Sequence, residues 1–245
     1  MNPAVAAATA RRVLWQLRRD PRTVALLLLV PCVLMTLMKY VLEGQEETFD
    51  RVGVPLLGIF PFISMFLVTS ITMLRERTTG TLERLMTMPI AKLDLLAGYA
   101  GAFALVGAVQ AALVCLLGFG ALGLDSRSPA VLVGAIAVAN GLLGMALGLF
   151  VSAFARTEFQ AVQFMPAFVL PQLLLCGLFV PRDRMAPALE SASGVLPLTY
   201  AYEALELVAT SDGVRGELAA DLAAVGGFMA AALVLGALTL RRRTP

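Results

Sequence analysis

The sequence contains no histidine, only three cysteines and few charged side chains. Without histidine, the chain lacks the commonest metal ligand and the side chain that most often exchanges protons near neutral pH. Cys32, Cys115 and Cys176 lie far apart inside apolar stretches, with no CxxC pair and no metal-site spacing, so we interpret them as packing residues. These absences argue against a metal site and against an enzyme that works inside a membrane. We therefore predict a chain that is not an enzyme, with no catalytic residues.

Lysine is almost as scarce, because only Lys39 and Lys92 occur and neither follows a glycine. A loop that cradles ATP phosphates needs the pattern G-x-x-x-x-G-K-[ST]. The chain has no such loop, so we expect it to bind no cofactor itself and any ATP-driven motor to be another polypeptide.

Apolar residues, in contrast, are abundant. The chain of 245 residues is 59% hydrophobic and 15% charged, with a mean hydropathy of +0.83, whereas soluble proteins average about 45–50% and about 25%. Six apolar stretches cover residues 24–42, 53–74, 95–124, 130–155, 159–180 and 218–240. Each approaches or exceeds the ~20 residues with which a helix crosses a bilayer, where the backbone finds no other hydrogen-bond partner. We predict a single all-α membrane domain over residues 1–245 with six transmembrane helices.

Basic residues are distributed unevenly between the two sides that six spans define. If the N-terminus is cytoplasmic, the inner side collects Arg11, Arg12, Arg18, Arg19, Arg22, Arg75, Arg77, Arg84, Lys92, Arg156, Arg241, Arg242 and Arg243. The outer side keeps only Lys39, Arg51, Arg127, Arg182, Arg184 and Arg215. Cytoplasmic loops carry the excess of Lys and Arg in membrane proteins. We therefore expect both termini in the cytoplasm.

Residues 1–23 precede the first span and contain an amphipathic helical pattern. At 100° per residue one face is apolar and the opposite face is basic. The apolar face holds Ala6, Ala10, Val13, Leu14 and Leu17, and the basic face holds Arg11, Arg12, Arg18, Arg19 and Arg22. This pattern suits a helix along the inner membrane surface, although arginines that only set the topology explain it equally well.

The stretch "RERTTGTLERLMTMPIAKLD" fills residues 75–94, between the second and third spans. Gly80 can cap a helix, Glu83 lies three residues later where its carboxylate can reach back to the Gly80 amide, and Pro89 ends the run. The result is a helix of about two turns, which is too short to span. We expect it at the cytoplasmic membrane edge as a docking surface.

The segment "RERTTGTLERLMTMP" resembles the signature of ABC-2 type transport permeases, and the resemblance extends over most of the chain. It includes the six spans, the N-terminal helix and "FVPRDRMAPALESASGVLPLTYAYEAL", which is similar to the family's external re-entrant segment, here residues 182–217. Drug-exporter permeases of the daunorubicin-resistance type are the most similar group. The resemblance implies a multi-pass protein of the bacterial cytoplasmic membrane that exports drug-like or lipid-like molecules.

The resemblance also implies partners. In this family the short helix is a coupling helix seated in a cleft of a separate ATPase subunit, which binds ATP and Mg, and two permeases make one pathway. The coupling residues would be Glu76, Arg77, Gly80, Thr81, Leu82, Glu83 and Arg84. The alternative is that the arginines only set topology and Glu83 only caps the helix. No nucleic-acid partner is expected.

Candidate cargo residues lie in the second and fifth spans, which by resemblance flank the pathway. They are aromatic, thioether or small polar side chains, as promiscuous sites require: Phe62, Met65, Phe66, Thr69, Phe164, Phe168 and Gln172. Packing against a neighbouring helix or lipid explains them as well.

An amphipathic helix is also predicted to begin at Pro197. Its apolar face would hold Leu198, Ala201, Tyr202, Leu205 and Val208. By resemblance it forms an external gate that includes Pro197, Tyr200 and Tyr202, and the alternative is a surface anchor.

Two other functions remain open. One is an ABC-2 exporter of lipid or glycan precursors. The other is an ion-coupled secondary transporter, which usually needs ionisable residues deep in its spans, whereas the span centres here contain no acids.

Overall fold

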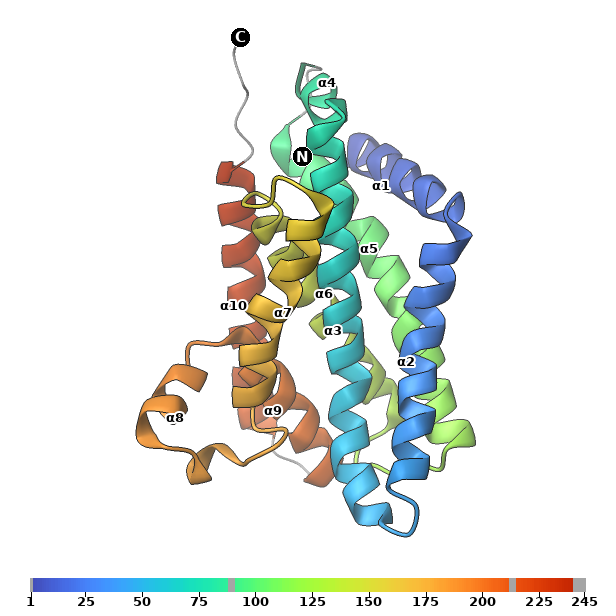
Figure 1. Cartoon of the computed structure of the whole chain (residues 1–245), viewed down its shortest axis with the longest axis vertical. Coiled ribbons are helices and arrows are strands. Elements are labelled where there is room, and N and C mark those ends of the chain that lie inside the picture. The colour runs from blue at the N-terminus through green and yellow to red at the C-terminus, as the bar shows by residue number, and fades with distance from the viewer. Residues whose placement is uncertain (1, 88–90, 212–214, 240–245) are drawn as a thin grey trace.

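The computed structural model describes residues 2–87, 91–211 and 215–239 as a bundle of long helices (Figure 1). In chain order the helices are α1 (Pro3–Arg18), α2 (Pro21–Val41), α3 (Glu46–Thr78), α4 (Thr81–Thr87), α5 (Lys92–Cys115) continued by a π-helix (Leu116–Ala121), α6 (Ala130–Val151), α7 (Glu158–Leu175), a 3₁₀ turn (Arg182–Arg184), α8 (Pro187–Ser193), α9 (Pro197–Thr210) and α10 (Arg215–Thr239). No strand occurs within these ranges. The all-α prediction is confirmed.

Five helical segments are long and apolar enough to cross a membrane: Pro21–Val41, Glu46–Thr78, Leu93–Ala121, Ala130–Val151 and Gly216–Thr239. The chain is therefore a multi-pass membrane protein. The predicted span 159–180 is not among the five, because α7 contains glutamines and two prolines and ends at Leu175. Beyond it Gly177 adopts φ +110°, where a Cβ would lie 2.9 Å from the Tyr202 ring. The sequence had predicted this helix five residues too long.

The centre of the bundle is the contact between α3 and α6. A Cβ on Gly144 would lie 2.1 Å from the Phe62 carbonyl oxygen, and one on Gly148 would lie 2.4 Å from that of Phe66. The two backbones can approach only because these positions have no side chain. Gly144 and Gly148 thus form a close helix contact, and their neighbour is α3 of the same chain.

Two caps start the N-terminal helices. The Asn2 side chain accepts a hydrogen bond from the Ala4 amide before Pro3 opens α1, and Asp20 accepts one from the Thr23 amide before Pro21 opens α2. A polar cap followed by proline at the first helical position favours a helix start. The short connection turns the chain sharply, so α1 crosses the end of the bundle while α2 runs along it (Figure 1).

The apolar face of α1 packs on α5 rather than on lipid alone. Val13 is buried in a cluster with Leu95, Leu96 and Tyr99 of α5. A Cβ on Gly98 would lie 2.4 Å from the Thr9 side chain, so the two helices touch closely. The predicted amphipathic helix is confirmed, and its apolar face is mainly a protein contact.

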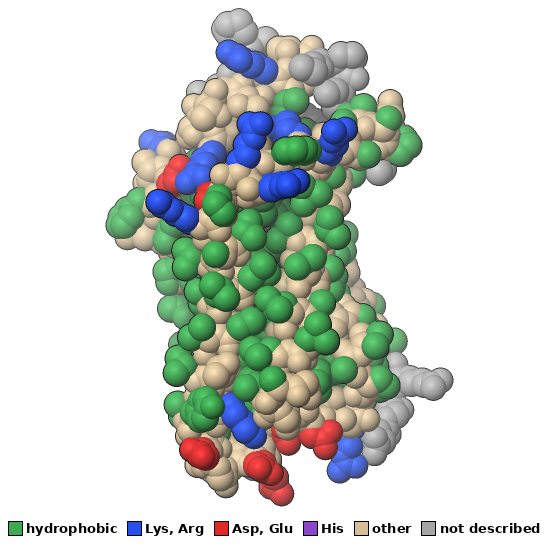
Figure 2. All heavy atoms as spheres, turned by 90° about the vertical axis from the view of Figure 1, so that its right-hand side faces the viewer, with side chains coloured by type: hydrophobic (Ala, Val, Ile, Leu, Met, Phe, Trp, Pro, Cys, Tyr) green, Lys and Arg blue, Asp and Glu red, His purple; other side chains and the backbone are tan. Residues whose placement is uncertain are grey.

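Peripheral helices cover this core. Little of α2 and α10 is buried, whereas most of α3 is buried. Figure 2 shows the resulting apolar belt, with Lys and Arg gathered at the end that carries α1 and most acidic residues at the opposite end. This charge asymmetry fits a bundle that crosses the membrane with α1 at the cytoplasmic side.

Helix α9 begins at Pro197, as predicted, and its five predicted apolar residues are all buried: Leu198, Ala201, Tyr202, Leu205 and Val208. It packs against α3, α6, α7 and α10. The Asn140 amide donates to the Ala201 carbonyl at 3.1 Å, and the Gln172 side chain accepts from the Leu198 amide at 3.3 Å. The helix is therefore an integral part of the bundle rather than an anchor on the lipid surface.

Candidate functional site

The two-turn helix predicted after the second span is present as α4, Thr81–Thr87. Gly80 adopts φ +70°, a left-handed conformation that favours glycine, and its carbonyl accepts a hydrogen bond from the Arg84 amide at 3.1 Å. Gly80 thus lies at the junction where α3 ends and α4 begins. Pro89 and the Glu83 side chain lie outside the described residues, so the predicted cap and stop stay predictions.

One face of α4 packs on the bundle. Leu82 is buried in the cluster that α1, α3 and α5 share, and Leu85 packs partly against the same cluster. Arg84 and Thr87 are exposed on the other face. Thr81 is half-buried, and its hydroxyl lies 3.0 Å from that of Thr79. The helix therefore presents a polar outer face while its inner face packs into this buried apolar cluster.

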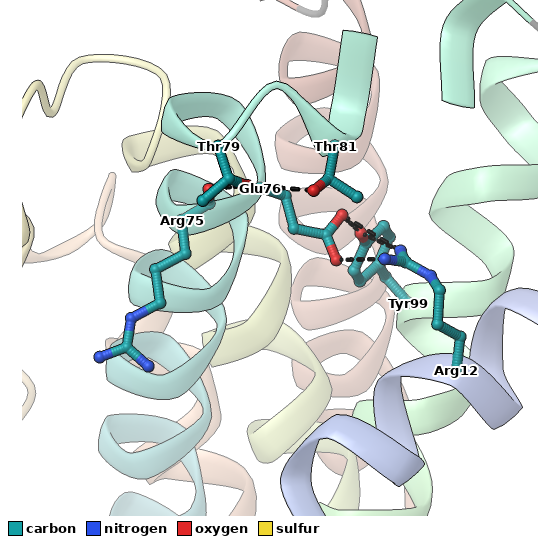
Figure 3. Close-up of polar contacts among 6 residues, drawn as sticks. All are labelled: Arg12, Arg75, Glu76, Thr79, Thr81 and Tyr99. Atoms are coloured by element: carbon teal, nitrogen blue, oxygen red, sulfur yellow. Dashed lines mark hydrogen bonds and ion pairs between the residues drawn. The ribbon is translucent and has the colours of Figure 1, made fainter. Parts of the chain in front are cut away.

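Glu76 lies in the last turn of α3 and is buried (Figure 3). Its Oε1 lies 2.8 Å from Arg12 Nη1, and its Oε2 accepts from Arg12 Nη2 at 3.1 Å. The Tyr99 hydroxyl also donates to Oε2 and itself accepts from Arg12 Nη2 at 2.8 Å. A buried carboxylate requires such partners because an unpaired buried charge is costly. The three side chains join α1, α3 and α5 directly below α4.

Arg75 points away from this cluster (Figure 3). It forms a bidentate pair with Glu158, with Nε–Oε1 at 2.8 Å and Nη2–Oε2 at 2.9 Å, and both side chains are more than half exposed. The hydrogen bonds from Arg75 hold the pKa of Glu158 below its usual value. Arg77 is half-buried. Glu76 and Arg77 are two of the charged residues predicted to couple the permease to an ATPase. Of the two, Glu76 is turned into the protein.

A profile of the family described as "ABC-2 type transporter" matches residues 5–208. The chain belongs to the ABC-2 type transporter family. The permease is 28% identical over 145 residues to "Probable multidrug ABC transporter permease YbhR" of Escherichia coli K12, covering 59% of this chain and 39% of that one. It is 26% identical over 162 residues to "Linearmycin resistance permease protein LnrN" of Bacillus subtilis, covering 65% and 40%. "Probable multidrug ABC transporter permease YbhS" of E. coli K12 is 26% identical over 141 residues, covering 57% and 37%. The matched part is thus about two-fifths of each relative's length.

An ABC-2 permease is a non-catalytic transport component, so the prediction that the chain is not an enzyme is confirmed. Within the described residues, no group of three His, Cys, Asp or Glu side chains could hold a metal ion.

The predicted cargo residues of the permease fall into two groups. Phe66 of α3 and Phe168 of α7 stack with ring centroids 6.2 Å apart, and Phe168 remains 39% exposed. Phe62 and Met65 are fully buried, and Met65 faces Gly107 of α5 and Gly141 of α6.

Three further cargo candidates lie near the α3–α7 contact. Thr69 is buried and its hydroxyl has no hydrogen-bond partner among the described residues. Phe164 is half-buried, and Gln172 is buried and bonded to the Leu198 amide. The structure thus brings Phe66 and Phe168 together. Phe62 lies one turn before Phe66 in the same buried cluster, whereas Met65 faces α5 and α6.

The predicted gate residues belong to a hydrogen-bonded segment that includes the 3₁₀ turn, α8 and α9. Arg182 pairs with Glu203 and donates to Ser193 Oγ at 2.8 Å, which joins the 3₁₀ turn to the end of α8 and to α9. The Tyr200 hydroxyl donates to the Gly194 carbonyl at 2.7 Å. Pro197 opens α9, and Tyr202 is buried against Gly177. The three gate residues therefore stabilise one compact segment.

Sequence reasoning missed Arg12 and Tyr99 as partners of Glu76. Arg12 had been placed with the other basic residues on the outer face of α1, yet it is half-buried. The available signal was Glu76 itself, an acid two residues after the end of a long apolar run that must find a cation if it turns inward.

Proposed function

We propose that this permease exports amphipathic drug-like or lipid-like molecules across the bacterial cytoplasmic membrane, driven by a separate ATPase subunit that binds ATP and Mg. The observation that carries the proposal is α4, a short helix with an exposed polar face at the arginine-rich end of an ABC-2 permease. A helix of seven residues cannot span a membrane. Its exposed face suits a contact with another protein.

Two sets of buried contacts connect α4 and the end of α3 to the rest of the bundle. Leu82 packs in the cluster shared by α1, α3 and α5, and Glu76 joins the same three helices through Arg12 and Tyr99. A displacement of α4 therefore acts on three helices at once. The coupling residues are Glu76, Arg77, Gly80, Thr81, Leu82, Glu83 and Arg84, in the proposed arrangement.

The proposal also includes that the chain crosses the membrane six times and that α7 is the fifth span. Its 18 residues correspond to a length of ~27 Å at 1.5 Å per residue, close to the ~30 Å hydrocarbon core. It lies beside α3 in the bundle and exposes Phe159, Val162, Leu170 and Leu174. Six spans place both termini on the cytoplasmic side.

Two permease copies or paralogues together enclose the cargo pathway. Phe168 is partly exposed next to Phe66, at a surface that a second permease can cover. The apolar and aromatic side chains there suit amphipathic cargo, and the relatives named for multidrug transport and linearmycin resistance favour drug-like molecules. The alternatives are lipid or glycan precursors as cargo, and an ion-coupled secondary transporter.

The experiment is co-purification followed by transport. The permease is co-expressed with a candidate ATPase subunit, purified and reconstituted, and the uptake of fluorescent drugs or labelled lipids into inverted vesicles is measured with ATP. We expect ATP-dependent uptake that Glu83→Ala abolishes while the complex still assembles. Glu190→Ala, which removes an exposed acid on α8 at the opposite end, is the matched control. Uptake driven by an ion gradient without ATP, or normal uptake by Glu83→Ala, would contradict the proposal.

A further inference from the structure

The outer face of α1 forms a cationic, aromatic surface that the proposed transport mechanism does not use. A shallow hollow of about 470 Å³ on this face is lined by Ala8, Arg11, Arg12, Trp15, Gln16 and Arg19. Trp15 is 48% exposed, although indole rings are usually buried in soluble proteins. Arg18 lies over the indole, with its guanidinium carbon 5.5 Å from the ring centroid.

The positive charge of this face is not balanced locally. Arg11, Arg18, Arg19 and Arg22 are exposed, and Asp20 is the only acidic residue among the first 42. Both Asp20 carboxylate oxygens are engaged by Thr23, through its amide at 3.2 Å and its hydroxyl at 2.7 Å. Arg12 differs from the others because it turns inward to Glu76.

The position of this face matches the headgroup level of a membrane. The opposite face of α1 is fixed to α5 by the Thr9–Gly98 contact and by a hydrogen bond from the Asn2 amide to Asp94 at 2.9 Å. Helix α2 begins at Pro21 and immediately exposes apolar side chains, including Leu26, Leu29 and Val33. In Figure 2 the basic residues gather directly above the apolar belt.

We propose that the outer face of α1 binds the phosphate groups of anionic phospholipids in the cytoplasmic leaflet. Guanidinium groups bind phosphate in a bidentate manner, and tryptophan favours the boundary between headgroups and acyl chains. The adjoining apolar belt favours a lipid over the other candidate occupant, an acidic protein surface. The bound lipids stabilise α1 in the position from which Arg12 reaches Glu76.

The single tryptophan makes a direct test possible, because all indole fluorescence comes from Trp15. The full chain is reconstituted without any ATPase, so the result is independent of the proposed function. The vesicles are phosphatidylcholine with a small, equal fraction of either brominated phosphatidylglycerol or brominated phosphatidylcholine. We expect stronger quenching of Trp15 by the brominated phosphatidylglycerol. In 0.5 M KCl this preference should fall, because salt screens exposed charges.

Matched double variants locate the binding face. Arg11→Gln with Arg19→Gln should weaken the preference for phosphatidylglycerol by about fivefold for each arginine removed. Arg84→Gln with Arg156→Gln removes two exposed arginines from the same end of the bundle and should leave the preference intact. Equal quenching by the two lipids in the wild-type protein would overturn the proposal, as would equal losses in both double variants. Quenching by neither lipid, with shielding of Trp15 by an added ATPase subunit, would instead identify a protein interface.

Discussion

Arg12 of α1 and Glu76 of α3 form an ion pair with contacts of 2.8 Å and 3.1 Å, although 64 residues separate them in the chain. Tyr99 of α5 completes the cluster (Figure 3). Glu76 is 4% exposed, so its carboxylate lies largely outside the reach of solvent, whereas Arg12 is half-buried. The cluster fixes α1, α5 and the end of α3 relative to one another, next to α4.

The first prediction concerns this pair. Arg12→Ala leaves the Glu76 carboxylate buried without its cation, and the loss of one partner of a buried pair costs about 3–5 kcal/mol. Tyr99→Phe removes one hydrogen bond to a charged group and should cost about 1.5–3 kcal/mol. Thermal unfolding of the purified permease in detergent measures both effects. Arg11→Ala, which removes an exposed neighbouring arginine, is the control. A melting temperature for Arg12→Ala equal to that of Arg11→Ala would show that the pair does not stabilise the fold.

The second prediction concerns the contact between α3 and α6. Gly144→Ala places a Cβ 2.1 Å from a backbone oxygen of α3, which cannot move without displacing the helix. We expect a large loss of folded protein, because the close approach depends on the absent side chain. Gly226→Ala in α10 meets no atom within 4 Å and should be neutral. The monodisperse fraction in size-exclusion chromatography distinguishes the two variants, and equal fractions would contradict the prediction.

The sequence predicts the local elements of this fold well. The glycine at position 80, the proline at position 197 and the apolar periodicities of α1 and α9 act over a few residues, and these helices form where predicted. The partners of those helices were not predictable in the same way. An amphipathic pattern is identical whether its apolar face meets lipid or protein, so the burial of α9 against α3 and α6 had to come from the structure.

In the candidate site, too, the local element is predictable from the sequence and its packing partners are not. The position of α4 follows from charges and glycine in the stretch that contains it, whereas the pairing of Glu76 with Arg12 and Tyr99 depends on how three distant helices pack. The end of α7 was missed for another reason. Residues 176–180 are apolar like the helix before them, but Gly177 turns the chain where Tyr202 fills the space.

The third prediction concerns the junction between α3 and α4. Gly80 has φ +70°, and a residue with a side chain is strained by about 1 kcal/mol in this conformation. Gly80→Ala should leave the yield of the permease nearly unchanged and reorient α4, which lowers drug-stimulated ATP hydrolysis by the reconstituted complex several-fold. Gly120→Ala, at a glycine with open space and no positive φ, is the control. Wild-type coupling in Gly80→Ala would argue against a role for this junction.

The fourth prediction uses the exposed pair of Arg75 and Glu158. Because Arg75 lowers the pKa of Glu158 in the folded protein, the pair stabilises the fold above the unfolded-state pKa, and this contribution disappears as the pH falls through the folded-state pKa. Both side chains are more than half exposed, so the effect is only about 0.5 kcal/mol. Glu158→Gln should therefore lower the melting temperature slightly at pH 7 and not at pH 3. A loss as large as that of Arg12→Ala would contradict the contrast between exposed and buried pairs.

The fifth prediction concerns cargo. Phe66 and Phe168 stack between α3 and α7, and Phe168 remains partly exposed at the surface proposed for the pathway. Replacing both by alanine removes the aromatic surface and should change the range of compounds to which the exporter confers resistance, by several-fold for the planar ones. The control is Phe159→Ala with Phe154→Ala, which removes two exposed rings away from the stack. Drug-resistance profiles of cells that express equal amounts of each variant measure the effect. A profile for Phe66→Ala with Phe168→Ala that matches the control would exclude this pair from the cargo site, because a binding surface cannot lose two rings without altered selectivity.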